Sequence, residues 1–235
     1  MDELVTLFGG AGFLGRYVAR ALLASGARLR IVGRDPKRAW YLKPQGGLGQ
    51  TQFVAADLRK PDTVRRAVQG ASAVVNLVGV LKGDFQGLHV DGARHVAEAA
   101  AAAGAGALVH VSAIGADPQS RSAYGRSKGL GEEAARAAYP GATIIRPSIL
   151  FGREDMFVNM FARMAQILPV LPVVRGDAKF QPLWVADAGR AIAAAALDPL
   201  THAGKTYALG GPEVLTMAGL NRYVQEATGR PVRVL

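Results

Sequence analysis

Hydrophobic residues in the first two thirds of the chain form short runs that alternate with segments of helical spacing. The runs are rich in Val, Ile and Leu and have the length of buried strands. They predict strands at residues 3–8, 28–33, 51–56, 72–79, 107–113 and 142–147. The intervening segments predict helices at residues 13–24, 62–68, 87–103 and 122–138. Because this alternation implies right-handed crossovers, we expect an α/β fold with a doubly wound parallel sheet of about seven strands.

The regular alternation loosens after Gly152. The remaining pattern predicts helices at residues 153–167, 185–197 and 217–227, with extended or strand-like pieces at 168–174, 180–184, 205–211 and 230–235. We predict a single structural unit, in which residues 1–150 form the main domain and residues 151–235 a small C-terminal lobe that packs on it and partly completes the sheet. The last predicted strand has no evident partner, which favours a natural chain that continues beyond it.

Four glycines crowd the turn between the first predicted strand and the first predicted helix, in the sequence LFGGAGFLGRYV. In such a strand–turn–helix context, glycines permit a tight turn, let the backbone approach a pyrophosphate and let the helix pack closely on the strand. The pyrophosphate then meets the N–H groups at the start of the helix. A glycine-rich turn that only packs is the alternative. We predict a Rossmann-type site for a nicotinamide dinucleotide, with the loop residues Gly9, Gly10, Gly12, Phe13, Leu14 and Gly15.

The residues after the second predicted strand bear on the choice between NAD(H) and NADP(H). An acidic residue at this strand end binds the ribose hydroxyls in NAD sites, whereas an arginine suits the 2′-phosphate of NADP. Arg34 holds the strand end, with Lys37 and Arg38 just beyond it, and a guanidinium pairs bidentately with phosphate. The pattern therefore favours NADP(H). Asp35 leaves NAD(H) open, since a shift of one residue would place its carboxylate in the pocket.

The net charge of +10 and the absence of cysteine narrow the expected partners and compartment. The basic residues are scattered and not interleaved with aromatic residues, which argues against nucleic acid. An acidic or membrane-associated protein partner, a lipid headgroup or a merely solvated surface remains. No signal peptide or transmembrane run is visible, so we expect a cytoplasmic protein, with peripheral attachment to the inner face of a membrane as the alternative. No metal site is expected, because none of the four histidines has ligand spacing: His89, His95, His110 and His202.

Further motifs extend this pattern along nearly the whole chain. Asp57-Leu58 follows directly on the third predicted strand, and the fourth ends in the sequence NLVG. The segments HVSAIGA, YGRSKGLGEE, RPSILFGREDMFVNMF and FQPLWVADAGRAI come later in the chain. Together with the glycine loop, they resemble the extended or atypical short-chain dehydrogenases/reductases, which include the NAD-dependent epimerase/dehydratases. The resemblance is most specific to a subgroup that contains an NADPH-binding accessory subunit of respiratory complex I, and related members are associated with ubiquinone synthesis.

The resemblance also implies roles for residues outside the glycine loop. In the family, the Asp-Leu pair brackets the adenine, a role that falls here on Asp57 and Leu58. The residues after the fourth strand line the path of the cofactor, which implies contacts from Val78 and Gly79. Pro147, at the end of the sixth predicted strand, is a further expected cofactor contact.

Tyr124 and Lys128 are the candidate catalytic pair. Of the six tyrosines, only Tyr124 has a lysine four residues later, a spacing that places both side chains on one face of a helix. In the family that the chain resembles, the tyrosine hydroxyl is an acid or base beside the nicotinamide, and the lysine stabilises the phenolate and binds the nicotinamide ribose. Ser112 matches the serine that binds the substrate oxygen. A pair that only supports the structure or binds the ribose is the alternative.

Two features weaken the enzymatic interpretation. Tyr124 follows Ser112 by only twelve positions, and Ala113 stands next to Ser112, whereas sugar-nucleotide epimerases have a longer loop with a second serine or threonine. No residues that would hold a nucleotide sugar are identifiable in the C-terminal lobe. We therefore expect an NADP(H)-binding accessory or assembly protein linked to complex I or quinone metabolism. The alternative is an active NAD(P)-dependent reductase, epimerase or dehydratase that acts on a small carbonyl or sugar-nucleotide substrate.

Overall fold

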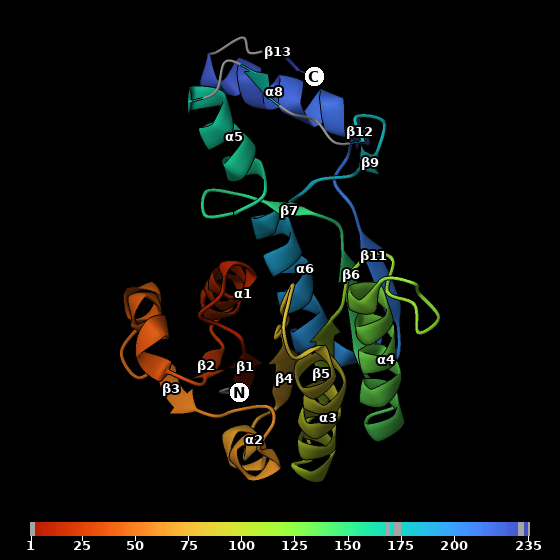
Figure 1. Cartoon of the computed structure of the whole chain (residues 1–235). Helices are drawn as coiled ribbons and strands as arrows, with labels where there is room; N and C mark the ends of the chain where they lie inside the picture. The colour runs from red at the N-terminus through yellow and green to blue at the C-terminus, as the bar shows by residue number, and fades with distance from the viewer. Residues whose placement is uncertain (1–2, 168–169, 172–174, 230–232, 235) are drawn as a thin grey trace. The chain divides into compact units, whose positions relative to one another are not determined.

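The computed structural model describes residues 3–167, 170–171, 175–229 and 233–234 (Figure 1). The chain divides into two compact units. The first comprises the described residues up to Pro147 together with Ala186–Ala208. The second comprises the described residues of Ser148–Val185 and Leu209–Leu235.

A seven-stranded sheet forms the centre of the first unit, in the order β11-β6-β5-β4-β1-β2-β3. The pairs β1–β2, β2–β3, β1–β4, β4–β5 and β5–β6 are parallel. The order reverses at β1 and β4, which is where ligands bind in doubly wound sheets. The predicted fold class is confirmed. The strands are β1 (Leu4–Phe8), β2 (Arg28–Gly33), β3 (Thr51–Ala55), β4 (Ala73–Asn76), β5 (Ala107–Val111), β6 (Thr143–Pro147) and β11 (Thr206–Leu209).

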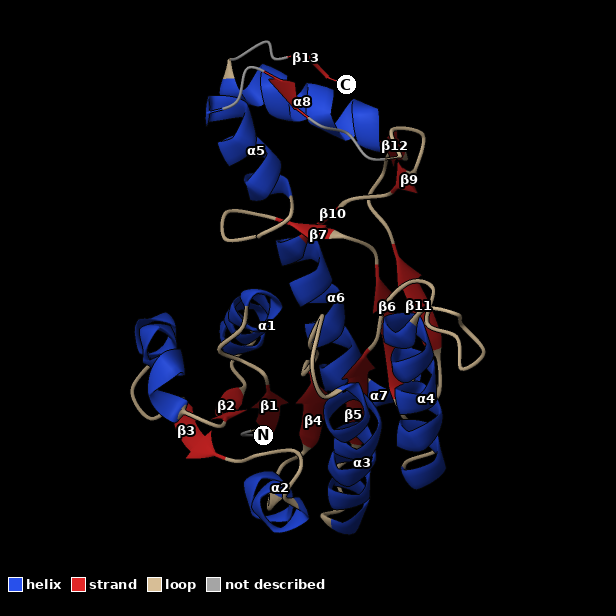
Figure 2. Cartoon of the chain, in the orientation of Figure 1, coloured by secondary structure: helices blue, strands red, loops and turns tan. Residues whose placement is uncertain are grey.

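Helices cover both faces of this sheet (Figure 2). On one face, α1 (Phe13–Ala24) and α6 (Val185–Leu197) pack so closely that a Cβ on Gly189 would lie 2.8 Å from the backbone of Tyr17. The other face carries α2 (Pro61–Val68), α3 (Gly92–Ala102) and α4 (Ala123–Ala138). Their buried aliphatic residues form one core with the strands beneath them, including Phe8, Val64, Val74, Val96, Leu108, Ala135 and Ile144. Short helix α7 (Pro199–His202) leads into β11.

Two helical segments of the first unit differ from the sequence prediction. Residues Pro36–Gln45 form a 3₁₀-helix, η1, after β2, although no element was predicted there. The helix predicted at 87–103 begins instead with a π-helical turn, η2 (Gln86–Asp91), and continues as α3. A π-helical turn adds a residue per turn and is common at functional sites. It also breaks the 3.6-residue spacing that the sequence analysis relied on.

The second unit consists of two helices and short strand pairs. Helix α5 (Val158–Ile167) packs against α8 (Met217–Thr228), with Phe161 and Leu220 buried. The predicted extended segment 168–174 and final strand 230–235 lie partly outside the described residues. The strand pairs are β7 (Leu150–Phe151) with β10 (Leu183–Trp184), β9 (Lys179–Phe180) with β12 (Leu215–Thr216), and β8 (Val170–Leu171) with β13 (Arg233–Val234).

Candidate functional site

The glycine loop joins β1 to α1 in a conformation that side chains would prevent. Gly9 has a φ of +81°, a left-handed conformation that favours glycine, and its carbonyl accepts a hydrogen bond from the Gly12 N–H at 3.0 Å. A Cβ on Gly15 would lie only 2.4 Å from the Gly9 oxygen and 2.6 Å from the Gly10 Cα. One on Gly10 would lie 2.8 Å from the side chain of Ile31. The loop therefore requires glycine for its turn and for the packing of α1 on it.

The start of α1 is suited to an anion. Gly12 is the N-cap residue, so no side chain caps the helix, and its first turn contains no acidic residue. The first N–H groups of a helix lack partners within the helix and carry its positive dipole end. A pyrophosphate close to Gly12 would accept hydrogen bonds from these groups.

A pocket of about 670 Å³ opens beside this loop. Of the predicted cofactor residues, Gly9, Gly12, Arg34, Val78 and Gly79 line it. It runs from the glycine loop to the ends of β2 and β4, the place where the strand order reverses. The sequence had pointed to Asp35 and Arg38 only as neighbours of Arg34, and both line the pocket. The other lining residues were not predicted: Ala11, Val32, Gly33, Leu77, Val80 and Leu88.

The end of β2 carries the charged part of the pocket. Arg34, Asp35 and Arg38 all line it. The Asp35 carboxylate accepts a hydrogen bond from the Lys37 N–H at 3.1 Å, because Asp35 is the N-cap of η1. By contrast, neither the Arg34 nor the Arg38 guanidinium caps η1.

The 3₁₀-helix η1 is attached to the glycine loop. The Tyr41 hydroxyl donates a hydrogen bond to the Ala11 carbonyl at 3.2 Å. The guanidinium of Arg16, on α1, lies 4.6 Å from the centre of the Tyr41 ring, within the range of a cation–π interaction. These contacts hold the segment that carries Arg38 against the loop.

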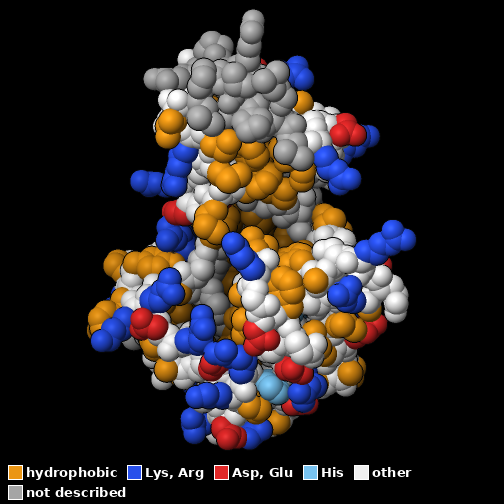
Figure 3. Space-filling view, viewed as in Figure 1, with side chains coloured by type: hydrophobic (Ala, Val, Ile, Leu, Met, Phe, Trp, Pro, Cys, Tyr) orange, Lys and Arg blue, Asp and Glu red, His pale blue; other side chains and the backbone are white. Residues whose placement is uncertain are grey.

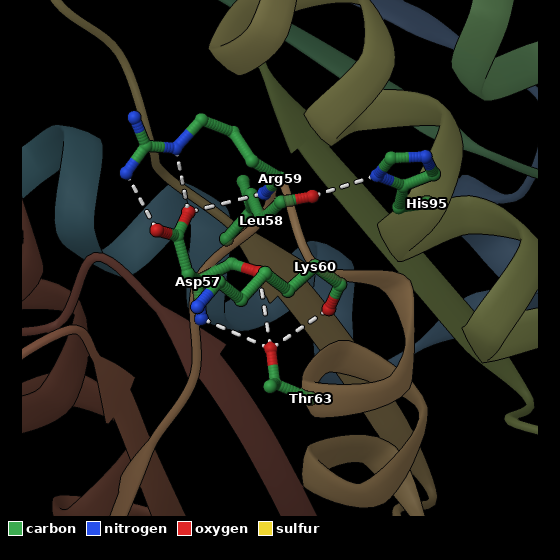
Figure 4. Close-up of polar contacts among 6 residues, drawn as sticks. All are labelled: Asp57, Leu58, Arg59, Lys60, Thr63 and His95. Atoms are coloured by element: carbon green, nitrogen blue, oxygen red, sulfur yellow. Dashed lines mark hydrogen bonds and ion pairs between the residues drawn. The ribbon is translucent and has the colours of Figure 1, made fainter.

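Asp57 and Leu58 do not line the described pocket. The Asp57 carboxylate accepts hydrogen bonds from the Arg59 Nε and Nη2 at 3.0 and 2.6 Å. These bonds lower the pKa of Asp57 to about 2. Leu58 is buried, and its carbonyl accepts a hydrogen bond from His95 Nδ1 at 2.7 Å (Figure 4). The carboxylate is therefore engaged with Arg59, and any contact with an adenine amino group would share it with that guanidinium.

The remaining predicted cofactor residues also lie outside the lining of the pocket. Gly10 and Gly15 act through the packing described above, and Phe13 makes an edge-to-face contact with Tyr17 at 6.0 Å between ring centres. Pro147, at the end of β6, accepts a hydrogen bond from the Ile114 N–H at 3.1 Å. Leu14 is partly buried in the first turn of α1.

Lys128 lies in the interior of the first unit, next to the wall of the pocket. It is 3 % exposed, and its Nζ donates a hydrogen bond to the Val111 carbonyl at 2.8 Å. A Cβ on Gly79 would lie 3.9 Å from this Nζ. Burial lowers the pKa of Lys128 to about 8, and the Glu132 carboxylate opposes this shift. The ammonium is therefore placed between the pocket wall and the strand that precedes Ser112.

Tyr124 lies one turn before Lys128 on α4, as the four-residue spacing predicts. Burial raises the pKa of the Tyr124 hydroxyl. Ser112 is 5 % exposed, and its Oγ has no hydrogen-bond partner among the described residues. A buried hydroxyl without a partner is costly, so Ser112 offers an unused donor and acceptor at the end of β5.

His89, which the sequence analysis treated as ordinary, links the pocket wall to α4. Its Nε2 accepts a hydrogen bond from the Val80 N–H at 2.9 Å, and its Nδ1 lies 2.8 Å from Ser127 Oγ. Ser127 donates to the Tyr124 carbonyl at 2.8 Å, so Nδ1 of His89 carries the proton. Burial lowers the pKa of His89 to about 4, with Lys128 as a second cause. The π-helical turn η2 positions this ring, which is why helical spacing gave no indication of it.

An ion pair supports the same helix from the strand beside it. Arg146, on β6, donates hydrogen bonds from Nε and Nη2 to the Glu132 carboxylate at 2.9 and 2.6 Å. Glu132 is 7 % exposed, so Arg146 compensates a carboxylate that burial would otherwise disfavour. The pair fixes the turn of α4 that follows Lys128.

Two absences hold for the described part of the chain only. It contains no group of histidine, aspartate and glutamate side chains arranged to hold a metal ion. None of its helices is both long and apolar enough to cross a bilayer. Figure 3 shows lysine and arginine side chains spread over the visible face of the first unit, with acidic side chains among them.

Residues 5–210 match the model of the NAD dependent epimerase/dehydratase family. The chain belongs to this family, which confirms the resemblance seen in its motifs.

Within the family, the chain is similar to subunits of respiratory NADH dehydrogenases. It is 39% identical to the mouse mitochondrial NADH dehydrogenase [ubiquinone] 1 alpha subcomplex subunit 9, over 97% of this chain and 62% of that protein. It is 35% identical to the ceramide reductase of Caulobacter vibrioides, over 84% of this chain and 62% of the relative. The chain thus spans about three fifths of the length of these relatives.

Solved structures share the fold at lower identity. A dTDP-glucose 4,6-dehydratase from Streptomyces venezuelae, with NAD bound, has a TM-score of 0.82 at 22% identity and covers 98% of this chain and 84% of its own. An NADPH-dependent quinone oxidoreductase from Escherichia coli, complexed with NADPH, has a TM-score of 0.79 at 22% identity, covering 98% and 77%.

Proposed function

We propose that this protein binds NADP(H) in the pocket beside the glycine loop and acts as an accessory or assembly protein of a respiratory NADH dehydrogenase or of quinone metabolism. The pocket geometry carries the first part of the proposal. Similarity to subunits of mitochondrial NADH dehydrogenases supports the second part.

The preference for NADP(H) rests on the charged groups at the end of β2. Asp35 was the argument for NAD(H), but its carboxylate caps η1, which makes it a weaker acceptor for ribose hydroxyls. Arg34 and Arg38 line the same part of the pocket, and two guanidinium groups suit a 2′-phosphate. Tyr41 holds η1 on the loop, so Arg38 is offered to the phosphate from a fixed segment.

The position of Lys128 supports a binding role. Tyr124 lies one turn before it on α4, and burial raises the pKa of the Tyr124 hydroxyl. Lys128 donates to the Val111 carbonyl, and its ammonium, close to Gly79, would hold the ribose. A nicotinamide dinucleotide, when bound, supplies hydride-transfer chemistry; the chain's own groups then hold the ribose and a proton at the Tyr124 oxygen.

The unpartnered Ser112 hydroxyl favours a second candidate, an active NAD(P)-dependent oxidoreductase or epimerase/dehydratase. Ser112, Tyr124 and Lys128 are all present, and Ser112 Oγ is free among the described residues to bind a substrate oxygen. In that case Tyr124 would donate or accept the proton and Ser112 would orient the substrate.

Calorimetric titration with NADPH and NADH tests the cofactor proposal, and a turnover assay separates the two functions. We expect NADPH to bind more tightly, and Tyr124→Phe to keep cofactor binding without affecting the function of the protein in cells. Equal affinities for the two cofactors would refute the preference for NADP(H). Turnover that disappears in Tyr124→Phe would establish the enzymatic alternative.

The peripheral location at a membrane belongs to the same proposal. The net charge of +10 attracts the protein to acidic partners or anionic headgroups. Cosedimentation of the protein with membranes at low salt, and its release at high salt, is the expected behaviour. Recovery of all the protein in the supernatant at low salt would contradict it.

A further inference from the structure

The side chains of the 3₁₀-helix η1 fall into three rows. A 3₁₀-helix has three residues per turn, so side chains three positions apart lie above one another. Ala39 and Leu42 form the first row and are buried. Arg38 and Tyr41 form the second row, in which Arg38 lines the pocket and Tyr41 is hydrogen-bonded to the glycine loop. The third row, the outer stripe, consists of Lys37, Trp40 and Lys43.

The outer stripe presents an aromatic ring between two positive charges. All three side chains are exposed, that of Trp40 to 53%. Lys37 Nζ lies 6.0 Å from the centre of the Trp40 ring, so the ammonium and the ring are neighbours. Neither Lys37 nor Lys43 forms an ion pair with a described acidic residue, and residues 36–56 contain no Asp or Glu. The stripe therefore carries positive charge that its own segment does not neutralise.

The other two rows hold the outer stripe in place. Leu42 is fully buried, and the Tyr41 ring is fixed by its hydrogen bond to Ala11 and by the Arg16 guanidinium. Helix η1 connects β2 to β3, the two strands at one end of the sheet (Figure 1). No residue of the outer stripe lines the described pocket, so a bound dinucleotide would leave the stripe available to another partner.

The chemistry of the outer stripe favours an anionic lipid surface. Tryptophan rings are enriched at the level of the lipid headgroups, and basic side chains near an anionic bilayer are attracted to it. A stable protein interface involves about 20–30 residues on each side, whereas the stripe supplies three, and a lipid surface demands no such matched area. Single-stranded nucleic acid needs several aromatic rings for successive bases, and Tyr41 is already engaged with the glycine loop.

We propose that the outer stripe docks this protein on an anionic bilayer, with the Trp40 ring among the headgroups and Lys37 and Lys43 paired with lipid phosphates. The proposal rests on the peripheral membrane location proposed above and names the face that carries it. The docked face then belongs to the same helix as Arg38, which lines the charged part of the pocket.

Binding of point variants to vesicles tests the proposal. The vesicles consist of phosphatidylcholine with or without phosphatidylglycerol, and cosedimentation at low salt measures the bound fraction. The parent protein should bind the vesicles that contain phosphatidylglycerol. Trp40→Ser should bind them about tenfold more weakly, because an aromatic ring no longer leaves water. Lys37→Ala and Lys43→Ala should each bind about fivefold more weakly, because each loses one attractive charge.

Two matched controls lie at the opposite end of the sheet. Lys205 directly precedes β11, the strand at the other end from β3, and Leu200 lies on α7 just before it. Both side chains are exposed. Lys205→Ala removes the same charge as a stripe variant, and Leu200→Ser removes an exposed apolar side chain. Each should change binding by less than about twofold, because charges farther from the bilayer than a Debye length are screened.

A second measurement leaves the outer stripe intact. The chain contains two tryptophans, Trp40 and Trp184, and Trp184→Phe keeps a ring beside Phe151. In that variant Trp40 is the only tryptophan. Its emission should shift to shorter wavelength when anionic vesicles are added, and brominated lipids should quench it. Bound protein whose Trp40 emission neither shifts nor is quenched would overturn the proposal.

The remaining outcomes separate this proposal from the location on which it rests. Binding that the stripe variants leave unchanged, or reduce no more than the controls do, would overturn the outer stripe and leave the peripheral location standing. Sedimentation with native membranes but with neither kind of vesicle would indicate an acidic protein partner and overturn docking on lipid. Sedimentation with neither membranes nor vesicles would refute the peripheral location itself. A change of molecular mass in solution in Trp40→Ser would assign the stripe to an interface between copies of this chain, and docking on lipid would again be overturned.

Discussion

The two ends of the candidate site in the first unit consist of different kinds of chemical groups. At the glycine-loop end, the lining consists of backbone groups and exposed arginines, and Gly9 and Gly12 leave the backbone open because they carry no side chain. At the Tyr124 end, the candidate groups are buried side chains from three parts of the chain: Ser112 after β5, His89 on η2 and Lys128 on α4.

The two ends also differ in the charge that they present. The glycine-loop end offers N–H groups of α1 and the guanidinium groups of Arg34 and Arg38, all suited to phosphates. At the Tyr124 end, burial keeps His89 neutral near pH 7 and lowers the pKa of Lys128. The glycine-loop end therefore presents exposed positive charge, whereas burial disfavours charge at the Tyr124 end.

The largest expected effect comes from the glycine-loop end. In Gly15→Ala, the new Cβ would lie 2.4 Å from the Gly9 oxygen, so the loop and α1 must separate. We expect a loss of about 3 kcal/mol in the free energy of unfolding, the upper part of the usual range for overpacking, together with weaker NADPH binding. Urea unfolding and calorimetry measure the two. Gly47→Ala, where a Cβ would meet only one side-chain atom at 3.7 Å, is the control and should have little effect.

A smaller effect is expected from the charged part of the same end. Arg34→Ala should weaken NADPH binding by about 2 kcal/mol, the value of a hydrogen bond to a charged group, and leave NADH binding nearly unchanged. Arg20→Ala, an exposed arginine on α1, should change neither. Calorimetry on the parent protein and the two variants measures these affinities. An equal loss of affinity for both cofactors in Arg34→Ala would speak against a 2′-phosphate at this position.

At the Tyr124 end, protonation of His89 should make the free energy of unfolding depend on pH. The pKa of His89 is about 4 in the folded protein, against about 6.5 when unfolded. The unfolded chain therefore binds more protons between these values, and stability should fall as the pH drops from 6.5 to 4. In His89→Gln, which keeps an acceptor and a donor but does not titrate, this fall should be smaller. It should not vanish, because burial lowers the pKa of His110 as well, to about 3. Chemical denaturation across this range measures it; an unchanged profile would contradict the role given to His89.

The smallest effect is expected at Lys128, between the two ends, and concerns NADPH affinity. Lys128 has a pKa of about 8, so its ammonium is lost as the pH rises through 8 in the free protein. If it holds the nicotinamide ribose, NADPH affinity should decline over pH 7–9 by about 1 kcal/mol, the value of one hydrogen bond. Lys128→Met should bind NADPH more weakly and show a flatter profile. Calorimetry at several pH values measures both, and parallel profiles for the two proteins would remove Lys128 from the binding site.

The fold and the glycine-loop end could be predicted because their determinants are local. Strand and helix periodicity, and steric demands at Gly9 and Gly15, act within a few residues of the chain. The roles of His89 and Asp35 could not be predicted in this way. His89 depends on a π-helical turn and on the distant Val80 and Ser127, and the engagement of Asp35 depends on η1, for which the sequence showed no clear pattern.

The prediction for Asp57 illustrates a different limit. Its position after β3 was read correctly from the sequence, as the strand bounds show. Its pairing with Arg59, two residues further on, depends on side-chain conformations that the spacing alone does not specify. Periodicity predicts which strand end a residue occupies, and packing decides with which group it pairs.

The division of the chain into units also constrains the order in which the protein can fold during synthesis. Residues Ser148–Val185 are inserted within the sequence of the first unit. The edge strand β11 and helix α6, which complete its sheet and one of its faces, leave the ribosome only after this insertion. Until then β6 presents an unpaired edge and α1 an uncovered side, the kind of transient surface on which nascent chains aggregate or recruit chaperones. The nucleotide pocket, whose lining ends at Leu88, is by contrast encoded early, so that a cofactor could stabilise the nascent domain before its last strand arrives.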